Sequence, residues 1–135
     1  MLFHLSVNYG LEYLTPQIPE CAVLAYEDTN TPRICFSDSI EGCLSALQDI
    51  PRIYYVYIID EHIDDDEIYH PSVKEVADAK INNEVWILRE VKVKCIGKIK
   101  SNEYDFTSRH NTGIGRRVTF FHYPYHWIER YVGLY

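Results

Sequence analysis

The sequence predicts an α+β fold in which strands dominate and helices are few, and three segments carry this prediction. In residues 91–100, valines and other apolar residues alternate with lysines, which is the period of a strand with one buried face. Residues 52–59 are dense in β-branched and aromatic residues, so we expect a central strand there. In residues 38–47, apolar residues recur at helical spacing, which predicts a short helix.

Length and composition favour one domain over residues 1–135. A chain of 135 residues, 47% of them hydrophobic, can bury a substantial core. The formal net charge of −7 argues against direct nucleic-acid binding through phosphate contacts. No apolar run is long enough to span a membrane and no secretion signal is evident, so we expect a cytoplasmic protein. The four cysteines contain no Cys-x-x-Cys pair, which predicts reduced thiols and no zinc site.

Two short strands are expected in the N-terminal part of the chain. Residues 2–7 form the first, which contains His4; a lone histidine among apolar residues is most often a satisfied core residue. Residues 8–31 are a long loop, which either covers the sheet or has a function. Residues 33–36 form the second strand. Its Arg33 is either a surface residue or, beside a nucleotide site, a bidentate hydrogen-bond donor to a pyrophosphate.

The expected helix begins directly after the second strand. Asp38 can cap it, and Glu41, three residues further on, completes a capping box. The residues expected to pack inward from this helix are Ile40, Cys43, Leu44 and Leu47.

An acidic segment, residues 60–67, follows the expected central strand. It contains Asp60, Glu61, Asp64, Asp65, Asp66 and Glu67. A solvated connection is the ordinary interpretation of such a run. The spacing lacks the glycine and the terminal glutamate of an EF-hand, so a calcium site of that type is not predicted.

Glu84 opens a further expected strand, residues 84–88, immediately after the turn formers Asn82 and Asn83. A carboxylate at this position is usually a solvated end residue, and the spacing alone favours that interpretation. A rigid strand can also hold a catalytic carboxylate, so both interpretations stay open at this point.

The last segment, residues 101–135, is expected to contain strands at 103–107 and 116–121, joined by a glycine-rich basic turn. The histidines of this segment do not form a metal-binding pattern, so no metal site is expected.

Three segments, in the same order along the chain, resemble the catalytic fold of the poly(ADP-ribose) polymerases, which are ADP-ribosyltransferases. They are a His-x-Ser motif in residues 3–6, an apolar strand that ends in Phe-Ser-Asp in residues 34–38, and an Asn-Glu pair followed by strands in residues 83–100. The resemblance implies a split, strongly bent β-structure around an NAD-sized cleft. It covers parts of residues 1–100, and residues 101–135 would be an extension packed on that core.

The resemblance also implies roles for single residues in an NAD site. Glu84 would be the catalytic carboxylate, which stabilises the oxocarbenium character that develops on the ribose. His4 would bind the adenosine ribose, and the backbone of Leu5 would hold the nicotinamide amide. The remaining cofactor-binding residues would be Ser6, Arg33 on the pyrophosphate, Phe36 beside the nicotinamide, and a stacking tyrosine, for which Tyr55 is chosen from Tyr54, Tyr55 and Tyr57.

The chain departs from the family pattern in three places, and these departures leave two functions open. Leu5 replaces a glycine, while Cys35 and Ala46 stand where the family has tyrosines. One function is the transfer of ADP-ribose from NAD to an unknown acceptor, with release of nicotinamide. The alternative is a catalytically inactive member that binds a nucleotide or a protein target. The segments Thr-Pro-Arg-Ile-Cys-Phe and Lys-Cys-Ile-Gly-Lys-Ile also resemble small phage and Gram-positive bacterial proteins. An acidic protein of this kind could inhibit a host nucleic-acid enzyme, because its charge mimics phosphate, and such an anti-defence inhibitor fits the alternative.

The two functions differ in the geometry that they require. For the transferase, we expect His4 and Glu84 on adjacent strands, opening into one pocket together with the turn at residues 37–39. Their placement on opposite faces of the sheet would contradict this expectation. For the binding protein, an exposed acidic or aromatic patch would be the relevant feature.

Overall fold

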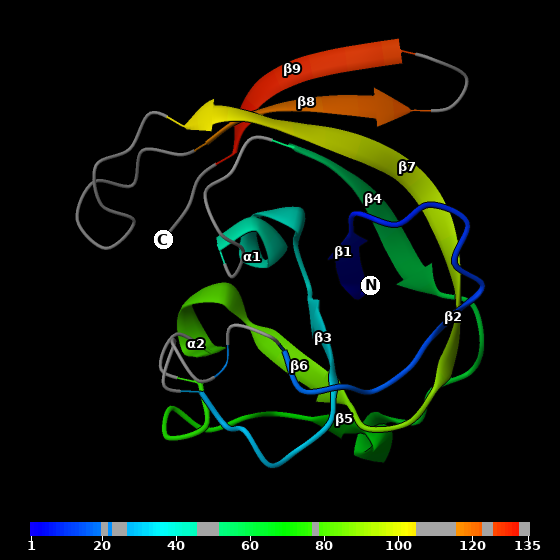
Figure 1. The fold of residues 1–135 in the computed structure, drawn as a ribbon, viewed down its shortest axis with the longest axis vertical. Coiled ribbons are helices and arrows are strands. Elements are labelled where there is room, and N and C mark those ends of the chain that lie inside the picture. Colours follow the sequence, from blue (N-terminus) through cyan, green and yellow to red (C-terminus); the bar gives the residue numbers. More distant parts are fainter. Residues whose placement is uncertain are drawn as a thin grey trace.

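The computed structural model describes residues 1–19, 22, 27–45, 52–76, 79–104, 116–122 and 126–132. Its strands form one sheet in the order β5-β6-β3-β1-β4-β7-β8-β9, with β2 paired to β7 outside this path (Figure 1). Every pairing between the described strands is antiparallel. The strands are β1 (Phe3–Ser6), β2 (Tyr13–Leu14), β3 (Ile34–Ser37), β4 (Arg52–Ile59), β5 (Ile68–Tyr69), β6 (Glu84–Ile87), β7 (Val91–Tyr104), β8 (Arg116–His122) and β9 (His126–Val132).

Helices contribute little to the described part of the chain. They are α1 (Ile40–Ser45), α2 (Ala79–Asn82) and the 3-10 turn η1 (Asp65–Glu67), so none reaches seven residues. The fold is therefore mostly an antiparallel sheet, and the α+β prediction is correct only in its strand part. Across the described ranges, no helix is long and apolar enough to cross a membrane.

The sheet is split between β1 and β3. β1 pairs with β4 along its whole length, but with β3 only through Phe3 and Ser37. β4 and β7 continue from β1 with a register shift after Val56 and curve around the other strands (Figure 1). Such a bulge bends and twists a pair of strands. Two arms, β5-β6-β3 and β1-β4-β7, therefore share a single residue pair between β1 and β3, and a separate backbone bridge joins Gln17 to Arg33.

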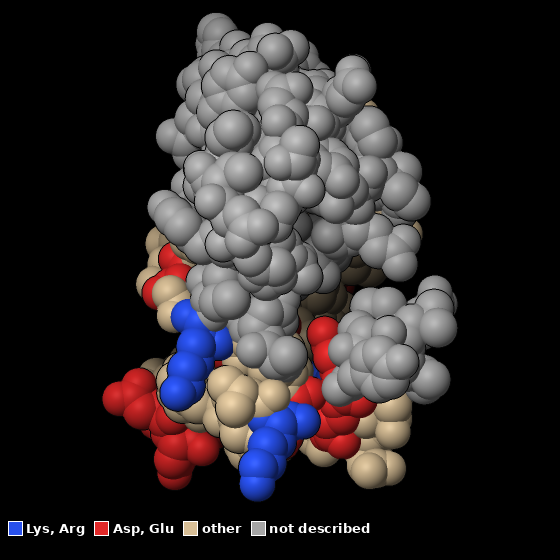
Figure 2. Space-filling view, turned by 90° about the vertical axis from the view of Figure 1, so that its left-hand side faces the viewer, with Lys and Arg blue, Asp and Glu red and all other residues tan. Residues whose placement is uncertain are grey.

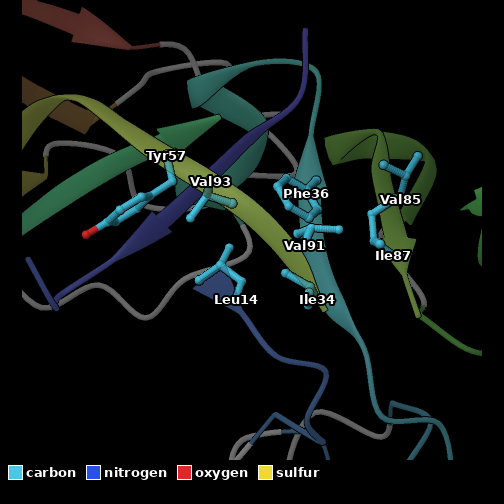
Figure 3. Close-up of a cluster of buried hydrophobic side chains, with 8 residues drawn as sticks. All are labelled: Leu14, Ile34, Phe36, Tyr57, Val85, Ile87, Val91 and Val93. Carbon is cyan, nitrogen blue, oxygen red and sulfur yellow. The ribbon is translucent and has the colours of Figure 1, made fainter. Parts of the chain in front are cut away.

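The main core lies on the inner face of this bend. Apolar side chains from both arms converge there (Figure 3): Leu14, Ile34, Phe36, Tyr57, Val85, Ile87, Val91 and Val93. A smaller cluster lies on the other face of β6, where Trp86 packs against Val76 and Ala79. Because β6 buries apolar residues on both of its faces, its sequence after Glu84 is a short continuous apolar run and does not alternate with polar residues.

Most of the predicted strands are confirmed, with adjusted ends. β4 matches residues 52–59 and is central, since it lies between β1 and β7. β7 continues through residue 100 to Tyr104 and pairs with β8, so the expected strand at 103–107 is partly the end of β7. Residues 105–115, which include the glycine-rich turn, lie outside the described residues.

The predicted cap of the helix is wrong by one residue. Ser39, rather than Asp38, caps α1, because its hydroxyl oxygen accepts the backbone N–H of Gly42 at 3.0 Å. The backbone carbonyl of Ser39 also accepts the N–H of Cys43 at 3.2 Å. Leu47 lies outside the described residues.

Two neighbouring residues at the end of β6 provide a test of this packing. Ile87 is fully buried, whereas Leu88 is 47% exposed. We expect Ile87→Ala to lower the free energy of unfolding by about 2–5 kcal/mol, because it leaves a cavity in the core. Leu88→Ala is the control and should change it by less than about 0.5 kcal/mol. Urea denaturation of both variants measures the difference, and equal losses would contradict the burial of Ile87 in the core.

Candidate functional site

Glu84 lies in a pocket of about 580 Å³ at the end of the sheet where β1 and β6 begin and β3 ends. The pocket forms where three segments meet: Leu2 before β1, Asp38 after β3, and the start of β6. Asn83 has a left-handed backbone (φ 53°), a conformation that asparagine tolerates better than most residues. This turn ends α2 and sets Glu84 at the first position of β6.

Two other segments close the pocket. Asp65 and His70 line it from the connection that contains β5, and Lys80 lines it from α2. The residues at the pocket thus include three carboxylates, one ammonium group and one imidazole, so its charge is predominantly negative. The turn at residues 37–39 contributes through Asp38, as expected from the sequence.

The carboxylate of Glu84 accepts a hydrogen bond from the indole of Trp86. The Nε1–H donates to Oε2 at 2.7 Å. Trp86 is fully buried, and the ring of Tyr69 stacks against it with centroids 5.4 Å apart. The guanidinium carbon of Arg33 lies 4.2 Å from the centroid of the Trp86 ring. A cation over an indole at this distance is attracted by the face of the ring.

The pyrophosphate role implied for Arg33 is wrong. Its side chain is fully buried and donates to the carbonyl oxygens of Asp28 at 2.8 Å and Thr31 at 3.1 Å. It also forms an ion pair with Glu27 at 3.5 Å. A guanidinium used in this way cannot reach a ligand in solvent. Arg33 therefore fastens the loop before β3 to the sheet.

His4 and Glu84 do not share the predicted pocket. β3 lies between their strands, so these strands are not adjacent. The register aligns Phe3, Ser37 and Glu84 in one row across β1, β3 and β6. Because side chains alternate along a strand, His4 leaves the sheet on the opposite face. The geometry that the sequence predicts for a transferase is contradicted.

The surroundings of His4 give it a structural role. Its Nδ1 lies 2.8 Å from the carbonyl oxygen of Cys35, and since a carbonyl only accepts, Nδ1 carries the proton. The ring also contacts Phe36, with centroids 5.7 Å apart. Both partners belong to β3, so His4 adds a side-chain contact across the split between β1 and β3.

The other residues implied for NAD binding divide between the two faces. Ser6 and Tyr55 are register partners and lie on the same face of the sheet as His4. Phe36 lies on this face too, where its side chain is part of the core. Tyr55 is partly buried, and its ring lies 5.1 Å from that of the exposed Tyr9. Leu5 is buried opposite Val56 on the other face.

The tyrosines next to Tyr55 are not stacking candidates. Tyr54 is buried. Tyr57 is fully buried, and its hydroxyl donates to the carbonyl oxygen of Asn8 at 2.6 Å and accepts the N–H of Leu11 at 3.3 Å. Tyr57 therefore secures the loop after β1.

Two of the described cysteines, Cys35 and Cys43, have environments that disfavour the reactive thiolate. Burial raises the pKa of the Cys35 and Cys43 thiols to about 12, and the negative charge of Glu84 adds to the effect. A thiol with such a pKa is almost entirely protonated near neutral pH and is a poor nucleophile. Within the described ranges, no group of three or more His, Cys, Asp or Glu residues is arranged to hold a metal ion.

Hydrogen bonds and ion pairs connect the acidic segment to Arg89 and to the start of β7. Arg89 donates to Glu61 at 2.8 Å and to Glu67 at 2.6 Å, and Glu61 accepts the backbone N–H of Lys92 at 2.7 Å. These bonds lower the pKa values of both carboxyl groups. On the face drawn in Figure 2, acidic and basic side chains lie next to each other at the lower end of the molecule. The segment is thus a solvated connection with internal ion pairs.

No protein-family model, curated protein or solved structure matches this chain. The pocket itself is therefore the guide to function. The sequence pattern identified Glu84 and the turn that contains Asp38, but it missed His70 and Lys80 at the pocket and the bond from Trp86 to Glu84. The position of Trp86 two residues after Glu84, on the same face of one strand, was the available signal for its role.

The partly buried imidazole of His4 predicts a pH dependence of stability. Burial lowers its pKa below the ordinary value of 6.5. In the unfolded chain His4 binds a proton near pH 6.5, whereas in the folded protein it binds a proton only at a lower pH, because its pKa is lowered. The contribution of His4 to the free energy of unfolding is complete above about pH 6.5. It is lost as the pH falls, by at most about 1.4 kcal/mol per pH unit.

We therefore expect the urea midpoint to be lower at pH 5.5 than at pH 7.5. The control is His4→Gln, whose amide can donate to the carbonyl of Cys35 but does not titrate. This variant should show a smaller decrease between the two pH values. Equal decreases in both proteins would contradict the lowered pKa of His4 in the folded protein.

Proposed function

We propose that this protein is a nucleotide-binding protein that takes the nicotinamide–ribose half of NAD, or of a related nucleotide, into the Glu84 pocket. One observation carries the proposal: Glu84, which the sequence resemblance marks as the ribose-binding carboxylate, lines a pocket of about 580 Å³. Ligand pockets typically enclose about 300–1,000 Å³. The split, bent sheet supports the relationship to the ADP-ribosyltransferase fold.

The charges at the pocket support a ligand with a cationic ring. Glu84, Asp38 and Asp65 outnumber Lys80, so the site favours the positively charged nicotinamide ring of NAD. The carboxylate of Glu84 is suited to accept ribose hydroxyl groups, because bonds to a charged acceptor are the stronger ones. Lys80 supplies the positive charge for a phosphate next to the ribose.

The proposal does not include ADP-ribosyl transfer. The expected reaction used His4 at the adenosine ribose and Arg33 at the pyrophosphate, together with Glu84. Arg33 is buried in the loop contacts described above, and His4 lies on the other face of the sheet. With two of these three groups away from the pocket, the inactive, nucleotide-binding alternative is the function that this geometry supports.

Calorimetry with NAD, ADP-ribose and nicotinamide mononucleotide tests the binding. We expect NAD and the mononucleotide to bind, and ADP-ribose, which lacks the cationic ring, to bind more weakly. Glu84→Gln should weaken NAD binding about tenfold, because a hydrogen bond to a charged acceptor becomes a neutral one. Asp60→Asn is the control, since it removes the same charge from an exposed residue outside the pocket.

Two outcomes would contradict the proposal. If the wild-type protein binds none of the three ligands, the pocket is not a nucleotide site, and the acidic segment becomes the surface to test for a protein target. If NAD is bound and nicotinamide is released above the rate without protein, the protein is an enzyme that cleaves NAD and passes the ADP-ribose to water or to another acceptor. In that case Glu84→Gln would slow release by about 10²–10³-fold with little change in affinity.

A further inference from the structure

Trp86 lies next to Glu84 in space as well as in sequence. Both residues belong to β6 and point to the same face, and the indole N–H donates to Oε2 of Glu84 at 2.7 Å. A hydrogen bond of this length to a carboxylate belongs to the strong, charge-assisted class. Trp86 itself has no exposed surface, so its N–H makes this bond away from competing water.

The plane of the indole is fixed by its other neighbours. Tyr69 stacks against it at an interplanar angle of 26°, and Arg33 lies over the ring. Arg33 is itself held by the carbonyl oxygens of Asp28 and Thr31. The direction of the N–H thus depends on Arg33, a buried group that does not line the Glu84 pocket.

We propose that Trp86 is a positioning residue, which holds the carboxylate of Glu84 in the orientation that receives a ribose hydroxyl. This inference rests on the proposed nucleotide site. A carboxylate held in one orientation before binding loses less side-chain entropy when the ligand arrives. The simpler role, a buried indole that satisfies its own N–H, requires the same bond but predicts no effect on ligand affinity.

The bond itself can be tested without any ligand. In ¹⁵N-labelled protein, the Nε1–H resonance of Trp86 is identified by its loss in Trp86→Phe. We expect this resonance to move when Glu84 is changed to Gln and to remain in place in Asp60→Asn. A resonance that is unaffected by Glu84→Gln would overturn the inference.

Ligand binding then separates positioning from simple burial. Trp86→Phe keeps an aromatic ring in the stack but removes the N–H donor, so we expect NAD to bind about tenfold more weakly. The double variant Trp86→Phe with Glu84→Gln should bind NAD no more weakly than Glu84→Gln alone. Trp86 acts only through the carboxylate of Glu84, so its substitution has no further effect once that carboxylate is gone. Tyr69→Phe is the control: it removes a hydroxyl that bonds Glu75 and leaves the stacked ring in place.

Wild-type affinity in Trp86→Phe, together with weakened binding in Glu84→Gln, would overturn the inference and leave the nucleotide site intact. If the wild-type protein does not bind NAD, the proposed nucleotide site is overturned. The proposal that Trp86 positions Glu84 for that ligand is then overturned as well. Thermal melts of all variants show whether each is folded, and the indole resonance reports on the bond even where affinity cannot be compared.

Discussion

A single residue pair, Phe3 with Ser37, joins β1 to β3 and sets the start of β1 beside the end of β3, where the pocket forms. The same row continues to Glu84 on β6. The start of β1, the end of β3 and the start of β6 therefore meet at one end of the sheet, where Leu2, Asp38 and Glu84 surround one pocket. The contact of His4 with the carbonyl of Cys35 supports this junction from the other face.

A buried cation stabilises the arm that contains Glu84. Removing a guanidinium from water is costly unless its N–H groups find acceptors. The terminal N–H groups of Arg33 find them in backbone carbonyls and in Glu27, and its guanidinium carbon lies over the indole of Trp86. Its Nε, in contrast, is buried without a hydrogen-bond partner among the described residues. One network thus links the loop before β3, the core of β6 and the carboxylate at the pocket. This network connects the buried interior of β6 to the acidic group at its start.

Much of the strand structure could be predicted, because alternation and β-branched residues are local properties of the sequence. β4, β7 and the strand that begins at Glu84 all follow from such patterns. The burial of Arg33 could not be predicted, since its acceptors are mostly backbone carbonyls in a loop without a side-chain signature. The face of His4 depends on the register across the split, and a shift of one residue reverses it.

Mapping the ligand on the protein tests the location of the site most directly. In a titration of ¹⁵N-labelled protein with NAD, the backbone resonances of Asp38, Lys80 and Asn83 should move together and saturate, because these residues line the Glu84 pocket. Movement confined to His4, Ser6 and Tyr55 would place the nucleotide on the opposite face of the sheet and contradict a nucleotide site at Glu84.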